Sequence, residues 1–137
     1  MHKNFTHNVK VYYEDTDAGG VVYYANYLKY LERARTEALS YIGLSNTKIK
    51  NDFGVLIIVK SCNIEYKKSA HLEDDLQIKS FVASTSKTSF LMNQSIFKDE
   101  KLIVKAKIHL VFINEIFKPV KIPEKILSEF KPYTSNS

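Results

Sequence analysis

The spacing of apolar positions changes along the chain, and each change predicts a different element. Val9, Val11 and Tyr13 alternate with polar residues, which predicts a first β-strand. Apolar residues then recur at steps of three and four: Tyr27, Leu31, Ala34, Ala38 and Ile42. This helical spacing, with charged residues on the opposite face, predicts a long amphipathic helix. Asn26 is a possible N-cap, although an earlier start is also compatible, and Gly43 is a natural stop.

Most of the remaining chain has the pattern of strands. The segment 54–61 is apolar nearly throughout, and its core, 55–59, has the length of a buried strand. A shorter strand follows at 64–67, and alternating stretches cover 76–82, 90–96 and 102–112. Pro123 then favours a short closing helix through Phe130, because proline is tolerated at the first helical position. One strand, one long helix and a run of strands is an α+β order, not an alternating βαβ order.

Size and composition favour one globular domain over residues 1–137. Hydrophobic residues make up 45% of the chain and charged residues 26%, and no apolar run approaches the roughly 20 residues of a membrane helix. The N-terminus lacks the apolar core of a signal peptide, so we expect a cytoplasmic protein. Cys62 is the only cysteine and lies in a predicted strand, where we expect a small buried hydrophobe and no catalytic thiol.

The candidate chemistry lies between the first strand and the long helix. Here two carboxylates, Asp15 and Asp17, precede Gly19 and Gly20. A turn of this kind can hold a carboxylate beside the first amides of a helix, which carry partial positive charge and lack partners within the helix. Those amides could stabilise an oxyanion, so the turn has what acyl transfer to water requires. From the turn alone, an aspartate that bonds its own backbone is the favoured interpretation.

A family resemblance starts at this turn. The segments 15–23, 25–27 and 32–37 resemble the opening of the YbgC-type acyl-CoA thioesterases, which belong to the 4-hydroxybenzoyl-CoA thioesterase group of hotdog-fold enzymes. Weaker similarity follows at 61–63 and 70–76. The resemblance implies a hotdog fold, in which an antiparallel sheet wraps one long helix, here with a short C-terminal helix added. It also implies an enzyme that hydrolyses acyl-CoA to fatty acid and CoA.

The resemblance assigns catalytic roles to two residues. Asp17 matches the acidic residue of the family and would serve as general base or as nucleophile. Tyr24 matches the position whose backbone amide polarises the thioester carbonyl, although many YbgC-type members carry His there. No strong general acid is essential, because a thiol leaves as a thiolate with a pKa near about 8.5.

Further positions are expected to bind the substrate. Gly19 and Gly20 would allow positive φ or close approach of the substrate. Val21 and Asn26 lie beside them at the start of the helix. A second set aligns with basic segments that contact CoA phosphates in the family, with single lysines where a family member has several arginines: Lys87, Thr88, Ser89 and Lys118.

The charge of the chain fits the same substrate. A formal net charge of +5 suits an anionic partner. The lysines are scattered and form no tract of five or more, so we expect CoA phosphates and no nucleic acid to account for the excess. We expect no cofactor, since CoA is part of the substrate, and no metal, because no histidine or cysteine cluster has ligand spacing.

Two other classes of function remain as alternatives. Dehydratases that share the fold carry a catalytic histidine on the early loop, where this chain has Asp17 and no histidine. A non-enzymatic basic hotdog module would bind an acyl carrier protein, a partner in the envelope Tol–Pal system, or RNA. One helix covers only part of a large sheet, so we expect a homo-oligomer, and the family resemblance favours a tetramer of hotdog dimers. The sequence does not specify the length of the acyl chain.

Overall fold

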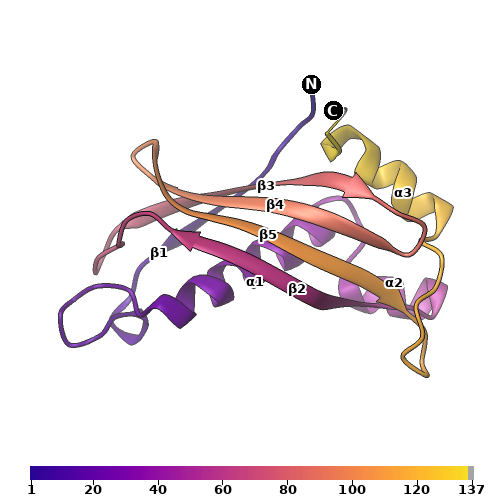
Figure 1. Ribbon diagram of the computed structural model, residues 1–137, viewed down its shortest axis with the longest axis horizontal. Coiled ribbons are helices and arrows are strands. Elements are labelled where there is room, and N and C mark those ends of the chain that lie inside the picture. The colour runs from indigo at the N-terminus through magenta and orange to yellow at the C-terminus, as the bar shows by residue number, and fades with distance from the viewer. Residues whose placement is uncertain (136–137) are drawn as a thin grey trace.

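One antiparallel sheet of five strands forms the body of the molecule (Figure 1). The structure is a computed structural model and describes residues 1–135. The strands are β1 (Phe5–Lys10), β2 (Leu56–Tyr66), β3 (Asp75–Thr85), β4 (Ser89–Lys98) and β5 (Lys101–Ile113). Their order across the sheet is β1-β3-β4-β5-β2, and every neighbouring pair is antiparallel. The predicted α+β class is therefore confirmed.

Helix α1 (Tyr24–Tyr41) is the long helix that the sequence predicts, and it packs on one face of the sheet. Its apolar stripe is buried, with Tyr27, Leu31, Ala34 and Ala38 all at most 3% exposed. The helix begins before Asn26, with Tyr23 at the N-cap. None of the helices in residues 1–135 is long and apolar enough to cross a membrane.

A second helix, α2 (Asn46–Phe53), was not predicted. The Ser45 hydroxyl caps it by accepting the Lys48 N–H at 3.2 Å. Gly54 ends it in the left-handed conformation with φ 67°. Helix α3 (Glu124–Phe130) follows Pro123, close to the predicted start, and short 3₁₀ helices cover Tyr13–Asp15 and Lys131–Tyr133.

Strand β2 differs from the prediction in extent and in burial. The two expected segments form one strand, interrupted by an irregularity between Val59 and Ser61. The expectation of a buried strand at 55–59 is wrong, because β2 lies at the edge of the sheet and Ile58 and Val59 are 39% and 47% exposed. The expectation that Cys62 is buried is wrong for the same reason.

The first strand is also displaced from its predicted position. Strand β1 ends at Lys10, so Val11 and Tyr13 lie beyond it. Val11 is nevertheless fully buried, and its N–H donates to the carbonyl of Asp74 at 2.9 Å. The chain then turns into the 3₁₀ helix, which places the Asp-rich turn at the start of α1.

Candidate active site

The turn at Asp17–Val21 is closed by its own backbone. The Asp17 N–H donates to the Val21 carbonyl at 2.9 Å, and the Gly20 N–H donates to the Asp17 carbonyl at 3.0 Å. Two further bonds fix the turn to the segment before β3, from Val22 N–H to the Ala70 carbonyl and from Leu72 N–H to the Gly20 carbonyl. The turn is therefore held on both sides although it lies at the surface.

The Asp17 carboxylate is exposed and is oriented by backbone amides. Its Oδ1 accepts the Gly19 N–H at 2.8 Å and, more weakly, the Val21 N–H at 3.4 Å. Within residues 1–135, Oδ2 has no hydrogen-bond partner. One oxygen is thus fixed by the turn, as in the backbone-bonding interpretation, and the other is left without a partner, while the catalytic role of this exposed residue stays a prediction.

The two glycines serve this arrangement in different ways. A Cβ at Gly19 would lie 3.3 Å from Asp17 Oδ1, so the residue must be small for the carboxylate to approach. Gly20 has φ 79°, a conformation that side chains with a Cβ rarely adopt. The expected positive φ occurs at Gly20, whereas the close neighbour at Gly19 is Asp17, so close approach of the substrate stays a prediction.

Asp15 supports the turn from inside. It is 9% exposed, and its carboxylate accepts the Tyr12 N–H at 3.0 Å. Its carbonyl accepts the Tyr23 N–H at 3.0 Å and Nδ2 of Asn26 at 2.8 Å. The pKa of Tyr30 on α1 is raised, mainly because the side chain is buried and secondly because it lies beside the Asp15 carboxylate. Asn26 therefore joins the turn to the helix, a contact that the sequence did not reveal.

The start of α1 carries free amides. Neither the Tyr24 N–H nor the Ala25 N–H has a hydrogen-bond partner in the described part of the chain. These groups lie at the positive end of the helix dipole. The Tyr24 side chain is 61% exposed, and the Tyr66 hydroxyl donates to the Tyr24 carbonyl at 3.4 Å. A free carboxylate and free helix-start amides therefore occur on adjacent segments.

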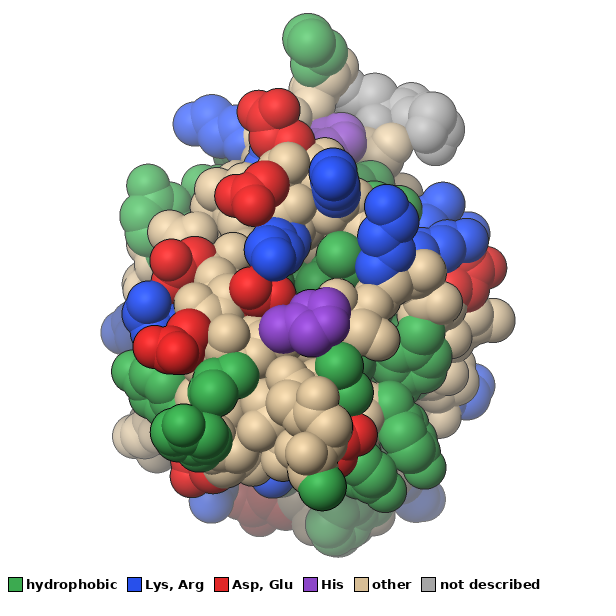
Figure 2. Space-filling model, turned by 90° about the vertical axis from the view of Figure 1, so that its left-hand side faces the viewer, with side chains coloured by type: hydrophobic (Ala, Val, Ile, Leu, Met, Phe, Trp, Pro, Cys, Tyr) green, Lys and Arg blue, Asp and Glu red, His purple; other side chains and the backbone are tan. Residues whose placement is uncertain are grey.

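Aromatic side chains surround this end of the molecule. Figure 2 faces it and shows hydrophobic side chains on both sides of a more polar surface. The exposed tyrosines of the turn, of the start of α1 and of the facing strand end are Tyr12, Tyr13, Tyr23, Tyr24 and Tyr66. An apolar group bound beside Asp17 would meet aromatic surface.

The residues expected to bind CoA phosphates lie elsewhere. Lys87 and Thr88 lie in the turn between β3 and β4, Ser89 is the first residue of β4, and Lys118 lies in the turn after β5. The two turns adjoin, because the Phe112 N–H donates to the Thr88 carbonyl and Phe112 accepts from the Val120 N–H. Both lysines are exposed.

His109 is an additional member of this second cluster. Its Nε2 lies 2.9 Å from the Ser89 hydroxyl, which is 2.7 Å from the Ser86 hydroxyl. In the sequence, 20 positions separate His109 from Ser89. The β4–β5 register, which places Leu91 opposite His109, brings it beside Ser89.

The two clusters lie at opposite ends of the sheet (Figure 1). Tyr66, which contacts Tyr24, pairs with Val104 on β5, whereas Ser89 pairs with Val111. The length of β5 between Val104 and Val111 is about 23 Å. A single chain therefore brings together Asp17, the glycines, Val21, Tyr24 and Asn26, and it does not bring Lys87 or Lys118 to them. Over residues 1–135, His, Cys, Asp and Glu form no group that could hold a metal ion.

Comparison with known proteins identifies the family. The chain matches the thioesterase-like superfamily over residues 11–130. It is 39% identical to acyl-CoA thioester hydrolase YbgC of Escherichia coli O6:H1 over 125 residues, which are 90% of this chain and 92% of the relative. It is 33% identical to acyl-CoA thioesterase YbgC of Haemophilus influenzae over 131 residues, 95% of this chain and 96% of the relative.

A solved structure agrees with the sequence relatives. The crystal structure of a probable thioesterase from Bartonella henselae is 32% identical and superposes with a TM-score of 0.84, covering 88% of this chain and 100% of the other. The chain therefore belongs to the thioesterase-like superfamily. The expectation of a YbgC-type thioesterase enzyme with the hotdog fold is confirmed.

Proposed function

We propose that this thioesterase hydrolyses acyl-CoA and that Asp17 performs the chemistry. The observation that carries the proposal is the free Oδ2 of Asp17, whose partner oxygen is held at 2.8 Å by the Gly19 N–H. The names of the relatives supply the substrate class, since both YbgC proteins are called acyl-CoA hydrolases or thioesterases.

Two routes through Asp17 balance chemically. As a base, the carboxylate takes a proton from water, and the resulting hydroxide attacks the thioester carbonyl carbon. As a nucleophile, the carboxylate attacks that carbon itself and forms an anhydride, which water then opens. In both routes the oxyanion collapses with loss of the CoA thiolate. The free N–H groups of Tyr24 and Ala25 support stabilisation of that oxyanion.

The routes differ in where oxygen from water first appears. Single-turnover hydrolysis in ¹⁸O-labelled water, with excess enzyme, labels the product acid directly if Asp17 acts as a base. If Asp17 is the nucleophile and water opens the anhydride at the aspartyl carbonyl, the first turnover instead incorporates ¹⁸O into the carboxylate of Asp17, so label on Asp17 identifies the nucleophilic route. Mass spectrometry of the peptide that contains Asp17 measures whether the carboxylate has gained ¹⁸O.

The complete site requires a second copy of the chain. CoA phosphates bound at Lys87 and Lys118 would lie at the far end of the sheet from Asp17 of the same chain. Edge strand β2 is 11 residues long and exposes Ile58, Val59 and Tyr66. Unpaired edges with exposed apolar residues favour pairing with another strand. We propose that two copies pair along β2, so that each supplies lysines to the other's Asp17.

Asp17→Asn tests the catalytic role. The substitution keeps an oxygen that can accept the Gly19 N–H but removes the charged oxygen, so we expect turnover to fall about 10²–10⁴-fold with an unchanged fold. The matched control is Asp52→Asn on the exposed face of α2, which should leave turnover unchanged. Release of CoA thiol from acyl-CoA of varied chain length provides the assay. Near-normal turnover of folded Asp17→Asn would refute the mechanism.

A further inference from the structure

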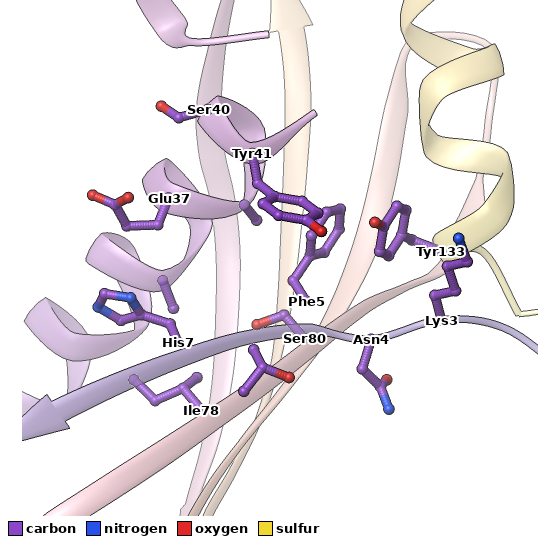
Figure 3. A pocket seen from close by; sticks show the side chains of 13 residues that line it. Lys3, Asn4, Phe5, His7, Glu37, Ser40, Tyr41, Ile78, Ser80 and Tyr133 are labelled. Carbon is purple, nitrogen blue, oxygen red and sulfur yellow. The ribbon is translucent and has the colours of Figure 1, made fainter. Parts of the chain in front are cut away.

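A cavity of about 820 Å³ lies far from the Asp17 turn (Figure 3). It is bounded by β1, by the second half of α1, by β3 and by Tyr133 near the C-terminus. Its α1 residues, Ala34 to Tyr41, start ten positions after Tyr24, and from Tyr24 to Ala38 the helix rises about 21 Å. The cavity is therefore separate from the candidate active site.

Small side chains on facing surfaces create this space. Ala34 and Ala38 face the sheet from α1, and Ser80 faces the helix from β3. All three are at most 3% exposed, and none is large enough to reach across. The volume is within the roughly 300–1,000 Å³ typical of small-molecule sites. The two alanines of the apolar stripe of α1 therefore leave a cavity beside the sheet.

Polar and apolar side chains both line the cavity, and its buried apolar part is partly aromatic. The rings of Phe5 and Tyr133 stack with centroids 3.8 Å apart and an interplanar angle of 8°. Phe5, Ala38 and Tyr133 form a small cluster separate from the main core. Figure 3 shows the Tyr41 ring at the same cavity, and this side chain is 80% exposed. A planar apolar group would therefore find aromatic surface here.

The floor of the cavity presents a hydrogen-bond donor. Gln94 Nε2 donates to the Ser80 hydroxyl and to the Leu31 carbonyl, each at 3.0 Å, while Oε1 of Gln94 accepts from Arg35. Because an amide nitrogen cannot accept, Ser80 is the acceptor in its bond with Gln94. The Ser80 hydroxyl proton then has no acceptor in residues 1–135. Ser80 is 1% exposed, so an unused donor lies buried at the cavity.

Polar groups of both signs stand at the rim. Lys3, His7 and Glu37 line the cavity, and none of their side chains has a hydrogen bond or ion pair within the described chain. A charged oxygen held deep inside by one hydroxyl would be costly. The acceptor at Ser80 must therefore be uncharged, and a charged or strongly polar group of a ligand would remain at the rim.

We propose that this cavity is a second small-molecule site, which binds an amphiphilic compound with an aromatic body and a neutral carbonyl, ether or hydroxyl oxygen. The ring packs against Phe5 and Tyr133, and the oxygen accepts the Ser80 proton. The site does not depend on the role proposed for Asp17.

The probe for the test is 4-phenyl-2-butanone, an aryl ketone that contains no thioester. Calorimetric titration of the full chain should give saturable binding with one probe per chain and a dissociation constant on the order of 1 mM. Ala38→Phe fills the cavity and should abolish binding while thioesterase turnover remains. The control Asn51→Phe adds the same ring at an exposed position on α2 and should bind normally.

Ser80→Ala separates the hydrogen bond from the apolar contacts. It should weaken binding roughly 2- to 10-fold. It also leaves a Gln94 N–H without its partner, so Ala38→Phe, which keeps that network, is the decisive variant.

Three results would overturn the proposal. The first is unchanged binding by Ala38→Phe, and the second is competition by CoA, which would put the probe at the active site. The third is that the native protein does not bind the probe and that Ala38→Phe has a lower oligomeric mass than the native protein. This result would mean that a second copy of the chain covers the cavity.

Discussion

Mixing two defective chains tests whether each site is shared between subunits. One chain carries Asp17→Asn and keeps both lysines. The other carries Lys87→Glu and Lys118→Glu and keeps Asp17. If one chain supplied both clusters, neither variant could complete the other. Because about 23 Å of β5 separates the two clusters within one chain, we expect instead that the two variants complement each other.

The expected signal follows from the geometry and from symmetry. Both lysines are exposed, so reversing their charge should raise KM at least about tenfold with little change in kcat. In an equal mixture paired at random, each mixed dimer contains one intact site and one doubly defective site, so about a quarter of all sites are intact. At low acyl-CoA concentration, the mixture should reach about a quarter of native activity.

The assay is thiol release after the two chains are unfolded together, refolded and freed of aggregates. The mixed-dimer sites should retain the native KM, which distinguishes them from residual activity of the lysine variant. A mixture whose activity equals the sum of the separate variants would refute sharing across subunits. Loss of the lysine effect on KM, or an equal effect with thioesters that lack the nucleotide, would refute phosphate binding at these residues.

Two further substitutions and one labelling experiment test single features of the structure. Gly19→Ala places a Cβ 3.3 Å from Asp17 Oδ1, so we expect lower kcat with little loss of stability, measured by turnover and thermal unfolding. Asp74→Asn should lower stability at pH 7 by about 0.5–1 kcal/mol. Burial alone would raise the pKa of Asp74, but the bond from Lys98 at 2.9 Å and the His71 N–H outweigh it and lower that pKa. This contribution is present above the unfolded pKa of about 3.9 and disappears as pH falls through the lower folded value, so native and variant stabilities should converge in strong acid. Cys62 is exposed in the single chain, and pairing along β2 predicts slow labelling by a thiol reagent at high protein concentration and fast labelling on dilution.

Local patterns predicted the elements whose periodicity is strong. The apolar stripe of α1 and the alternation in β5 were sufficient, because each has one face covered by the other layer. Helix α2 was missed because it is short and buries only Ile49. The sequence signal that could have revealed this helix is its pair of capping residues, Ser45 and Gly54. The burial of β2 was predicted wrongly, because apolar content does not reveal which strand lies at a sheet edge.

The candidate site divides in the same way. Asp17 and its glycines are close in sequence, so the motif identified the turn and allowed for the positive φ of Gly20. The bond from Asn26 to the Asp15 carbonyl needs the actual path of the chain. The distance between Asp17 and Lys87 depends on strand order and register across the whole sheet, which no local pattern contains. The same holds for His109 beside Ser89.

Under the proposed pairing, the exposed edge at β2 also links the stability of the protein to its concentration. An uncovered strand of 11 residues with apolar side chains can be recruited by any other extended chain, so the isolated subunit is the form at risk of aggregation. The pairing proposed above would remove that form by mass action, so the melting temperature should rise with protein concentration. Lower synthesis of this chain would therefore reduce its amount and also raise the fraction of unpaired subunits that can aggregate.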